Sequence, residues 1–347
     1  MRSTNKIKNS HALIQNGSSE KLRLGRSLLL QAYEYCLKRV DPYAITGAAL
    51  EIDGSVMTVQ GRLFDLDKYR NIFVVGAGKA GDRMAAAVEN LLSGRITGGW
   101  VNIPAPVIDE ESCLSRAQQP AASRIARNFA GHPLPDAAGV HGTLELLKIV
   151  EQAGVDDLVI CLISGGGSSL LPLPREPLSL ADKQLVTGLL LRSGADVSEI
   201  NTVRKHISSI KGGWLATRCW PATVINLVLS DVIGDPLDFI ASGPTVPDST
   251  TFGDAVAVLK KYSLCEAFPA QVLQLLSAGS AGQLSETPKA HDKVFEKVFN
   301  SVIGNNLTAR SAIAESLHSS GVRVVSHENS FTGSVEDAVT HIYSAFS

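Results

Sequence analysis

Three short turns and one basic segment hold the residues of this sequence that are best suited to chemistry. Each turn follows an apolar run that is typical of a buried strand. The turns are Gly76–Gly81 (GAGKAG), Ser164–Ser169 (SGGGSS) and Ser230–Pro236 (SDVIGDP), and the basic segment is Asn201–Lys211. Glycine lets backbone N–H groups approach a ligand, and the other residues supply hydroxyl donors, positive charge and carboxylate oxygens. These residue types favour a site for an anion.

The first turn places Gly76, Gly78 and Gly81 around Lys79, between a predicted strand and a predicted helix. Such a turn presents backbone N–H groups and a helix N-terminus to a phosphate. A dinucleotide site would also need an acid at the end of the next strand, and Trp100–Pro104 contains none. Lys79 adds a cation that suits a phosphoryl group. We predict phosphate or anion binding, with a dinucleotide site and a plain tight turn as the alternatives.

Consecutive glycines mark the second turn. Their backbone N–H groups can form an anion-binding nest, and the serine hydroxyls add donors or a metal contact. No Gly-Lys-Ser/Thr follows, so the turn is not a Walker A loop. The predicted binding residues are Ser164, Gly165, Gly166, Gly167, Ser168 and Ser169. The alternative is a merely flexible turn.

Two carboxylates, Asp231 and Asp235, follow the third apolar run. At the edge of a sheet, such groups hold Mg²⁺ beside phosphates or accept a hydroxyl proton, and a helix N-cap is the alternative. In the basic segment, Arg204 is the best candidate for bidentate binding of a carboxylate or phosphate, and a solvated helix face is the alternative. His132, in GHPLPD, contacts substrate or stabilises its own turn.

Strands and helices are predicted to alternate along most of the chain. Strands are expected at 71–75, 99–107, 157–163, 222–229, 294–303 and 322–325, and helices at 82–92, 139–153, 178–193, 200–218, 254–262, 269–276, 306–319 and 335–346. This alternation indicates an α/β fold with a doubly wound, mostly parallel sheet. We divide the chain into a disordered tail or transit segment (1–22), a large domain (23–249) and an incomplete second α/β lobe (250–347).

Composition excludes several classes of protein. The 347 residues are 44% hydrophobic and 19% charged, as in globular proteins. A net charge of −2 argues against a nucleic-acid or anionic-membrane partner, and no apolar run approaches the roughly 20 residues of a membrane span. Five cysteines without a CxxC pair favour a reducing compartment. The basic start, Met1–Arg26, is typical of a polar tail or a transit peptide, so we expect a cytoplasmic location with a mitochondrial one as the alternative.

A set of motifs resembles the glycerate 2-kinases that carry a MOFRL-type C-terminal domain. In chain order the motifs are VVGAGKAG, GHPLPD, LISGGGSSLL, INTVRKHIS, LSDVIGDP, ASGPTVPD and VIGNN, from Asn71 to about Asn306. The resemblance implies phosphorylation of D-glycerate to 2-phosphoglycerate with ATP and Mg²⁺. It also implies a Rossmann-like large domain, with the site in a cleft against a smaller domain. The family's lysine maps onto Lys79, and its strand-end aspartates map onto Asp231 and Asp235.

The resemblance ends before two later segments of that family. Its Gly-Gly-Glu segment and its GRGGRNQE segment, which supplies a catalytic arginine, do not occur in this sequence. We therefore expect the chain to correspond to the N-terminal part of such a kinase and to have little or no kinase activity by itself. The alternatives are a non-catalytic binding or regulatory fragment and an NAD(P)-dependent hydroxypyruvate reductase. The expected partners are glycerate and a nucleotide, and a homo-oligomer is left open.

Overall fold

The computed structural model describes residues 7–105, 123–325 and 334–345. The chain divides into two compact units, which are described separately. The larger unit runs from Arg39 to Asn306, and the smaller unit combines Met1–Lys38 with Leu307–Ser347. The division predicted from the sequence, at residues 22 and 249, stays a prediction.

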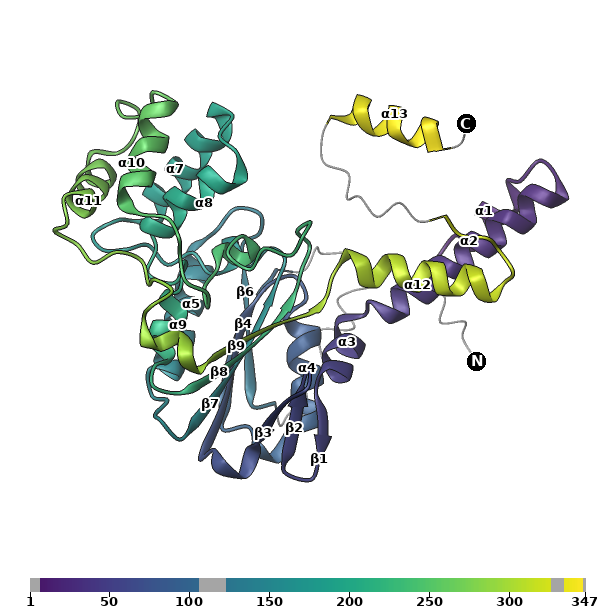
Figure 1. The fold of residues 1–347 in the computed structure, drawn as a ribbon, viewed down its shortest axis with the longest axis horizontal. Coiled ribbons are helices and arrows are strands. Elements are labelled where there is room, and N and C mark those ends of the chain that lie inside the picture. Colours follow the sequence, from purple (N-terminus) through teal and green to yellow (C-terminus); the bar gives the residue numbers. More distant parts are fainter. Residues whose placement is uncertain (1–6, 106–122, 326–333, 346–347) are drawn as a thin grey trace. The chain divides into compact units, whose positions relative to one another are not determined.

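A six-stranded parallel sheet, counted over the described residues, forms the centre of the larger unit (Figure 1). Its strands are β4 (Asn71–Ala77), β5 (Gly98–Pro104), β6 (Ile125–Ala130), β7 (Asp157–Ser164), β8 (Thr223–Leu229) and β9 (Val298–Gly304). They lie in the order β6-β5-β4-β7-β8-β9, which is the 3-2-1-4-5-6 order of doubly wound nucleotide-binding folds. The predicted α/β fold with a Rossmann-like parallel sheet is confirmed. Winding reverses between β4 and β7, and such sheets bind ligands beyond the carboxyl ends of those strands.

Both faces of this sheet are covered, which is why every residue of β7 is buried. On one face, Phe73 and Val75 of β4 share a core with α5 (Ala137–Val150) and α9 (Trp214–Cys219). On the other, Ile72 and Val74 share a core with α4 and with a small antiparallel sheet. The elements of this second layer are α4 (Gly81–Leu92), β1 (Glu51–Asp53), β2 (Val56–Val59) and β3 (Arg62–Asp65). A nearby short helix, α3 (Pro42–Ala49), packs on α4.

Four helices of the larger unit share a further apolar core and form one group in Figure 1. They are α7 (Leu180–Ser193), α8 (Val197–His206), α10 (Phe252–Lys261) and α11 (Ala270–Ser280). Capping boxes begin α7, α8 and α10, at Ser179, Asp196 and Thr251. Because these caps fix where α7 and α8 begin, they also fix the positions of the basic side chains on both helices.

The smaller unit is helical in its described part. Its helices are α1 (Ser10–Gln15), α2 (Glu20–Arg39), α12 (Asn306–Ser319) and α13 (Val335–Ala345). Cys36 Sγ of α2 donates a hydrogen bond to Ala309 O of α12 at 3.5 Å. In neither unit do the described residues include a helix long and apolar enough to cross a membrane.

The structure differs from the predicted elements in several places, one of which is the strand predicted at 294–303: residues 294–297 lie in a short 3-10 helix, and β9 begins at Val298. Strand β6 was not predicted, because Arg127 interrupts its apolar pattern and is buried through ion pairs with Asp82 and Glu89. The predicted helix 200–218 is wrong as one element, since Gly212 and Gly213 adopt φ angles of 55° and 87° and separate α8 from α9. The predicted strand 322–325 forms no strand. Residues 106–107 of the strand predicted at 99–107 lie outside the described residues.

Glu199 connects the start of α8 to the end of α10. Hydrogen bonds from Lys261 and Tyr262 lower the pKa of the Glu199 carboxyl from its ordinary value of 4.5 to about 2. Since the pKa in the folded protein is the lower one, this contribution to stability is present above pH 4.5 and lost as the pH falls through about 2. We expect Glu199→Gln to flatten the fall in unfolding free energy across that pH window, measured by urea titration. A variant with the parent's acid profile would contradict this.

Candidate functional site

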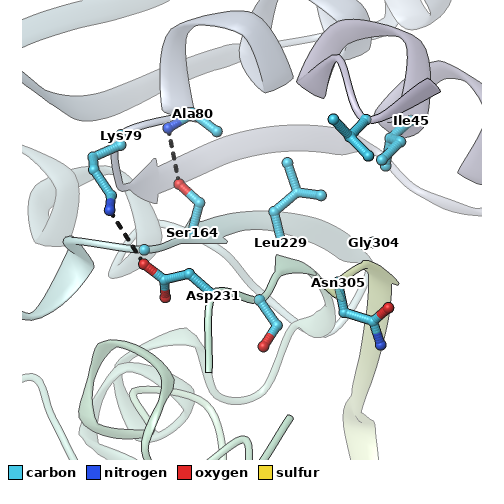
Figure 2. Close-up of a pocket in the computed structure, with 11 residues that line it drawn as sticks. Ile45, Lys79, Ala80, Ser164, Leu229, Asp231, Gly304 and Asn305 are labelled. Atoms are coloured by element: carbon cyan, nitrogen blue, oxygen red, sulfur yellow. Dashed lines mark hydrogen bonds and ion pairs between the residues drawn. The ribbon is translucent and has the colours of Figure 1, made fainter. Parts of the chain in front are cut away.

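Lys79 and Asp231 meet at the carboxyl edge of the sheet (Figure 2). Lys79 Nζ lies 3.2 Å from Asp231 Oδ2, although the two residues are 152 positions apart in the chain. Both side chains are about half exposed, at 55% and 52%. An ion pair this exposed contributes only about 0–1 kcal/mol, so a ligand can replace it at low cost.

The pair lines a cavity of about 220 Å³. The rest of its lining is Val40, Ile45, Ala80, Ser164, Gly165, Leu229, Ser230, Gly304 and Asn305. These residues come from the carboxyl ends of β4, β7, β8 and β9 and from the segment before and within α3. The cavity therefore lies where the strand order places the ligand site of a doubly wound sheet.

Direct contacts hold the first two turns against each other. Lys79 N–H donates to Gly165 O at 2.8 Å, and Ala80 N–H donates to Ser164 Oγ at 3.0 Å. Gly78 adopts a φ of 147°, and a Cβ there would lie 2.0 Å from Ser164 Oγ, so a larger residue does not fit. The GAGKAG and SGGGSS turns thus form one surface, from which Lys79 extends.

His132, from the GHPLPD segment, covers the middle of the second turn. A Cβ on Gly166 would lie 2.5 Å from His132 Nε2 and 3.3 Å from Lys79 Cγ, so both side chains approach the same glycine. His132 Nε2 is buried and has no hydrogen-bond partner among the described residues. A buried nitrogen left unpaired costs about 1–3 kcal/mol. This favours a substrate contact for His132 over a purely local role in its turn.

The two predicted aspartates occupy different positions. Asp231 lines the cavity, whereas Asp235 accepts a hydrogen bond from Asn305 Nδ2 and is not part of the lining. Asn305 does line the cavity, so Asp235 positions a residue of the wall. Neither aspartate caps a helix in the described part of the chain, which removes the structural alternative considered from the sequence.

Arg204 reaches the far end of the second turn from α8. Its Nη2 lies 3.4 Å from Ser168 O, and Lys211 Nζ donates to the same carbonyl at 2.8 Å. Burial lowers the pKa of the Arg204 guanidinium to about 10. Lys183 of α7, which sequence reasoning missed, belongs to the same group because its charge and that of Arg204 both act on Lys211.

Hydrogen bonds through the Ser242 hydroxyl connect the side chain of Ser168 to Asn201 of α8. Ser242 Oγ donates to Asn201 Oδ1 at 2.9 Å and lies 2.7 Å from Ser168 Oγ. Ser242 and Ala241 adopt φ angles of 62° and 52°, a left-handed conformation that costs free energy in residues other than glycine. Strain of this kind is concentrated at functional sites. In the sequence, only the ASGPT motif indicates that this segment has a functional role.

The remaining predicted residues pack rather than line the cavity. Gly76 lies in β4 against Leu162, Gly81 begins α4, and Gly167 lies against Ala241. Ser169 donates its hydroxyl to Gly166 O at 3.0 Å within its own turn. These residues set the backbone path of the two turns, and a direct ligand contact is a prediction for them.

Two glycine-to-alanine substitutions distinguish a glycine that packs against backbone from one that lies against a side chain of the cavity. A Cβ on Gly76 would lie 2.2 Å from the backbone Leu162 O, so we expect Gly76→Ala to lower the unfolding free energy by about 1–3 kcal/mol. A Cβ on Gly165 would lie 2.0 Å from Asp231 Oδ2, a side-chain atom that can move away. Gly165→Ala should therefore lower the unfolding free energy less than Gly76→Ala does. The opposite ranking of the two variants in calorimetry would contradict these contacts.

Known proteins similar to this chain share its fold. A family model described as "Domain of unknown function (DUF4147)" matches residues 28–277. Glycerate 2-kinase of Pyrococcus horikoshii is 37% identical over 313 residues, which cover 90% of this chain and 67% of that protein. A crystal structure from Pyrococcus horikoshii has a TM-score of 0.74 at 38% identity, covering 86% of this chain and 64% of that one. Glycerate kinase of Thermotoga maritima has a TM-score of 0.67 at 34% identity, covering 85% and 63%.

The fold and the site define an α/β protein of the doubly wound type, with glycine-rich turns and a lysine at the point where the winding reverses. The chain belongs to the glycerate 2-kinase family, and the DUF4147 match includes all three turns that were singled out from the sequence. It spans about two thirds of the length of these relatives.

Proposed function

We propose that the protein phosphorylates D-glycerate to 2-phosphoglycerate with ATP. The observation that carries this proposal is the approach of Lys79 to Asp231, beside glycine-rich turns at the switch point of the sheet. Phosphoryl transfer needs positioned positive charge, backbone N–H groups for phosphate oxygens and a carboxylate near the attacking hydroxyl. The names of the relatives from Pyrococcus horikoshii and Thermotoga maritima support the same activity.

In this proposal Lys79 neutralises the charge that develops on the transferring phosphoryl group. Asp231 accepts the proton of the attacking hydroxyl or binds Mg²⁺, and Asp235 holds the wall through Asn305. The Gly165–Ser169 backbone cradles phosphate or carboxylate oxygens. Binding of the substrates breaks the Lys79–Asp231 pair and frees both groups for these roles.

The residues present fit a magnesium ion that the nucleotide helps to hold. The described residues contain no group of three or more His, Cys, Asp or Glu side chains that could hold a metal on their own. Mg²⁺ is usually bound by one or two carboxylates together with substrate phosphates and water, and Asp231 supplies such a half-exposed carboxylate. When bound, the ion neutralises charge on the phosphates.

The proposal is tested by titrating the purified chain with ATP, D-glycerate and NADH. Formation of 2-phosphoglycerate is followed by phosphorus NMR at high protein concentration, which detects rates far below the usual range of about 1–1,000 per second. Formation of 2-phosphoglycerate supports the kinase. Binding without turnover supports the non-catalytic alternative, and loss of NADH with hydroxypyruvate supports the reductase.

A further inference from the structure

Arg204 and Lys211 contact Ser168 O at the end of the SGGGSS turn, and the charge of a third cationic side chain, Lys183, acts on Lys211. Lys183, Arg204 and Lys211 are called the basic cluster below. Lys183 and Lys211 are 5% and 1% exposed, so their amino groups lie inside the protein. Within the described residues, their hydrogen bonds are all to backbone carbonyls: Lys183 Nζ lies 3.4 Å from Leu173 O and 3.3 Å from Ile207 O, and the other two share Ser168 O.

No carboxylate of the described residues forms an ion pair with any member of the basic cluster. The neighbouring Lys205, in contrast, forms two ion pairs: its Nζ lies 3.3 Å from Asp248 Oδ1 and 3.5 Å from Asp238 Oδ2. Buried charges in proteins are normally paired, so the difference is informative. Burial and the charge of Arg204 lower the pKa of both Lys183 and Lys211, as expected for positive charge without a counter-ion.

The basic cluster and the adjacent Asn201 also have N–H groups that make no hydrogen bond to a described residue. Arg204 is partly exposed, and of its five N–H groups one makes a long contact to Ser168 O. Asn201 Oδ1 already accepts from Ser242, and its amide nitrogen makes no hydrogen bond to a described residue. Lysine, arginine and amide N–H groups without an acid nearby match the acceptor oxygens of a carboxylate or phosphate.

We propose that the basic cluster binds a small oxyanion, a carboxylate or a phosphate, with Arg204 as the direct contact and the two lysines supplying charge behind it. The site lies at the Ser168 end of the SGGGSS turn, whereas Lys79 and Asp231 lie at its Gly165 end. One ligand can therefore contact both ends of the turn. The identity of the oxyanion as part of glycerate or ATP rests on the proposed function, but oxyanion binding itself does not.

The stability of Lys211→Met separates this role from a purely structural one. If Lys211 only ties the turn to α8, removing its hydrogen bond to Ser168 O lowers the melting temperature of the free protein. If it is retained for oxyanion binding, methionine of similar size removes an unpaired buried charge, and the melting temperature of the free protein rises. Lys205→Met is the matched control, and it should lower the melting temperature because it leaves Asp248 buried without its partner.

Calorimetric titration with inorganic phosphate, D-glycerate and ATP measures the binding. We expect Arg204→Gln and Lys211→Met each to weaken at least one of these ligands about tenfold or more, since charge-assisted bonds are lost. The exposed control Lys148→Met, which removes the same charge from a pair with Glu145, should leave every affinity unchanged. Weakening of glycerate alone assigns a carboxylate to the cluster, and weakening of phosphate and ATP alone assigns a phosphate.

The proposal is overturned if the parent chain binds none of the three ligands, if both variants bind them as the parent does, or if Lys211→Met lowers the melting temperature of the free protein. None of these measurements requires turnover. A chain that makes no 2-phosphoglycerate but loses phosphate affinity in Arg204→Gln would contradict the proposed kinase and support the oxyanion site.

Discussion

Lys79→Met should lower the rate of 2-phosphoglycerate formation at least about 100-fold, the usual effect of removing one preorganised group that stabilises transition-state charge. The Lys79 side chain is 55% exposed, and its ion pair contributes little to the free energy of unfolding. The melting temperature should therefore change by no more than a few degrees. Methionine keeps the length of the side chain and removes only its charge. Product formation is measured by phosphorus NMR and the melting temperature by calorimetry.

Two controls make this result specific. Lys148→Met removes an exposed, paired lysine on α5 and should keep the parent rate. Lys79→Arg keeps the charge but changes its geometry, so it should recover only part of the rate. A Lys79→Met variant that turns over at the parent rate would remove Lys79 from the chemistry and leave the GAGKAG turn with a structural role.

The sheet and the positions of its turns could be predicted because each long apolar run is a strand buried on both faces. The runs before Gly76, Ser164 and Ser230 became β4, β7 and β8, so the three turns met at one edge. Strand β6 could not be predicted in this way. It lies at the edge of the sheet, where the polar Arg127 is accommodated by ion pairs that form only in the folded protein.

The contact between Lys79 and Asp231 depends on strand order, which periodicity does not supply. Their strands, β4 and β8, are separated by β7, so the two side chains meet across the turn that follows β7. Gly165 lies in that turn, and a Cβ there would occupy the place of Asp231 Oδ2. The sequence indicated a glycine-rich anion nest, and the fold adds a second reason for the glycine.

The basic cluster was only partly predictable. Arg204 and Lys211 belong to one basic segment of the sequence, whereas the sequence around Lys183 is typical of an exposed lysine on a helix. Its burial follows from the packing of α7 on α8, which brings its ammonium group to Ile207 O at the end of α8. Lys205 lies in the same basic segment as Arg204, but its partners are Asp238 and Asp248.

Asp231→Asn should raise the Mg²⁺ concentration for half-maximal turnover about 10- to 100-fold, if Asp231 is the carboxylate that holds the ion. Asparagine keeps the size of the side chain and one ligand oxygen but loses the negative charge. Asp235→Asn is the matched comparison, because Asp235 lies behind Asn305 and does not line the cavity. It should shift the Mg²⁺ requirement much less, while loosening the wall that Asn305 forms.

The pattern across the two variants assigns the role of each aspartate. If Asp231→Asn loses turnover that no Mg²⁺ concentration restores, while MgATP affinity stays at the parent value, Asp231 acts as the base for the substrate hydroxyl. If Asp235→Asn carries the larger Mg²⁺ shift, the ion lies on the Asn305 side of the cavity instead. Parent-like Mg²⁺ dependence and parent-like rates in both variants would remove the strand-end aspartates from the mechanism, because the proposed roles require the negative charge of Asp231 beside Lys79.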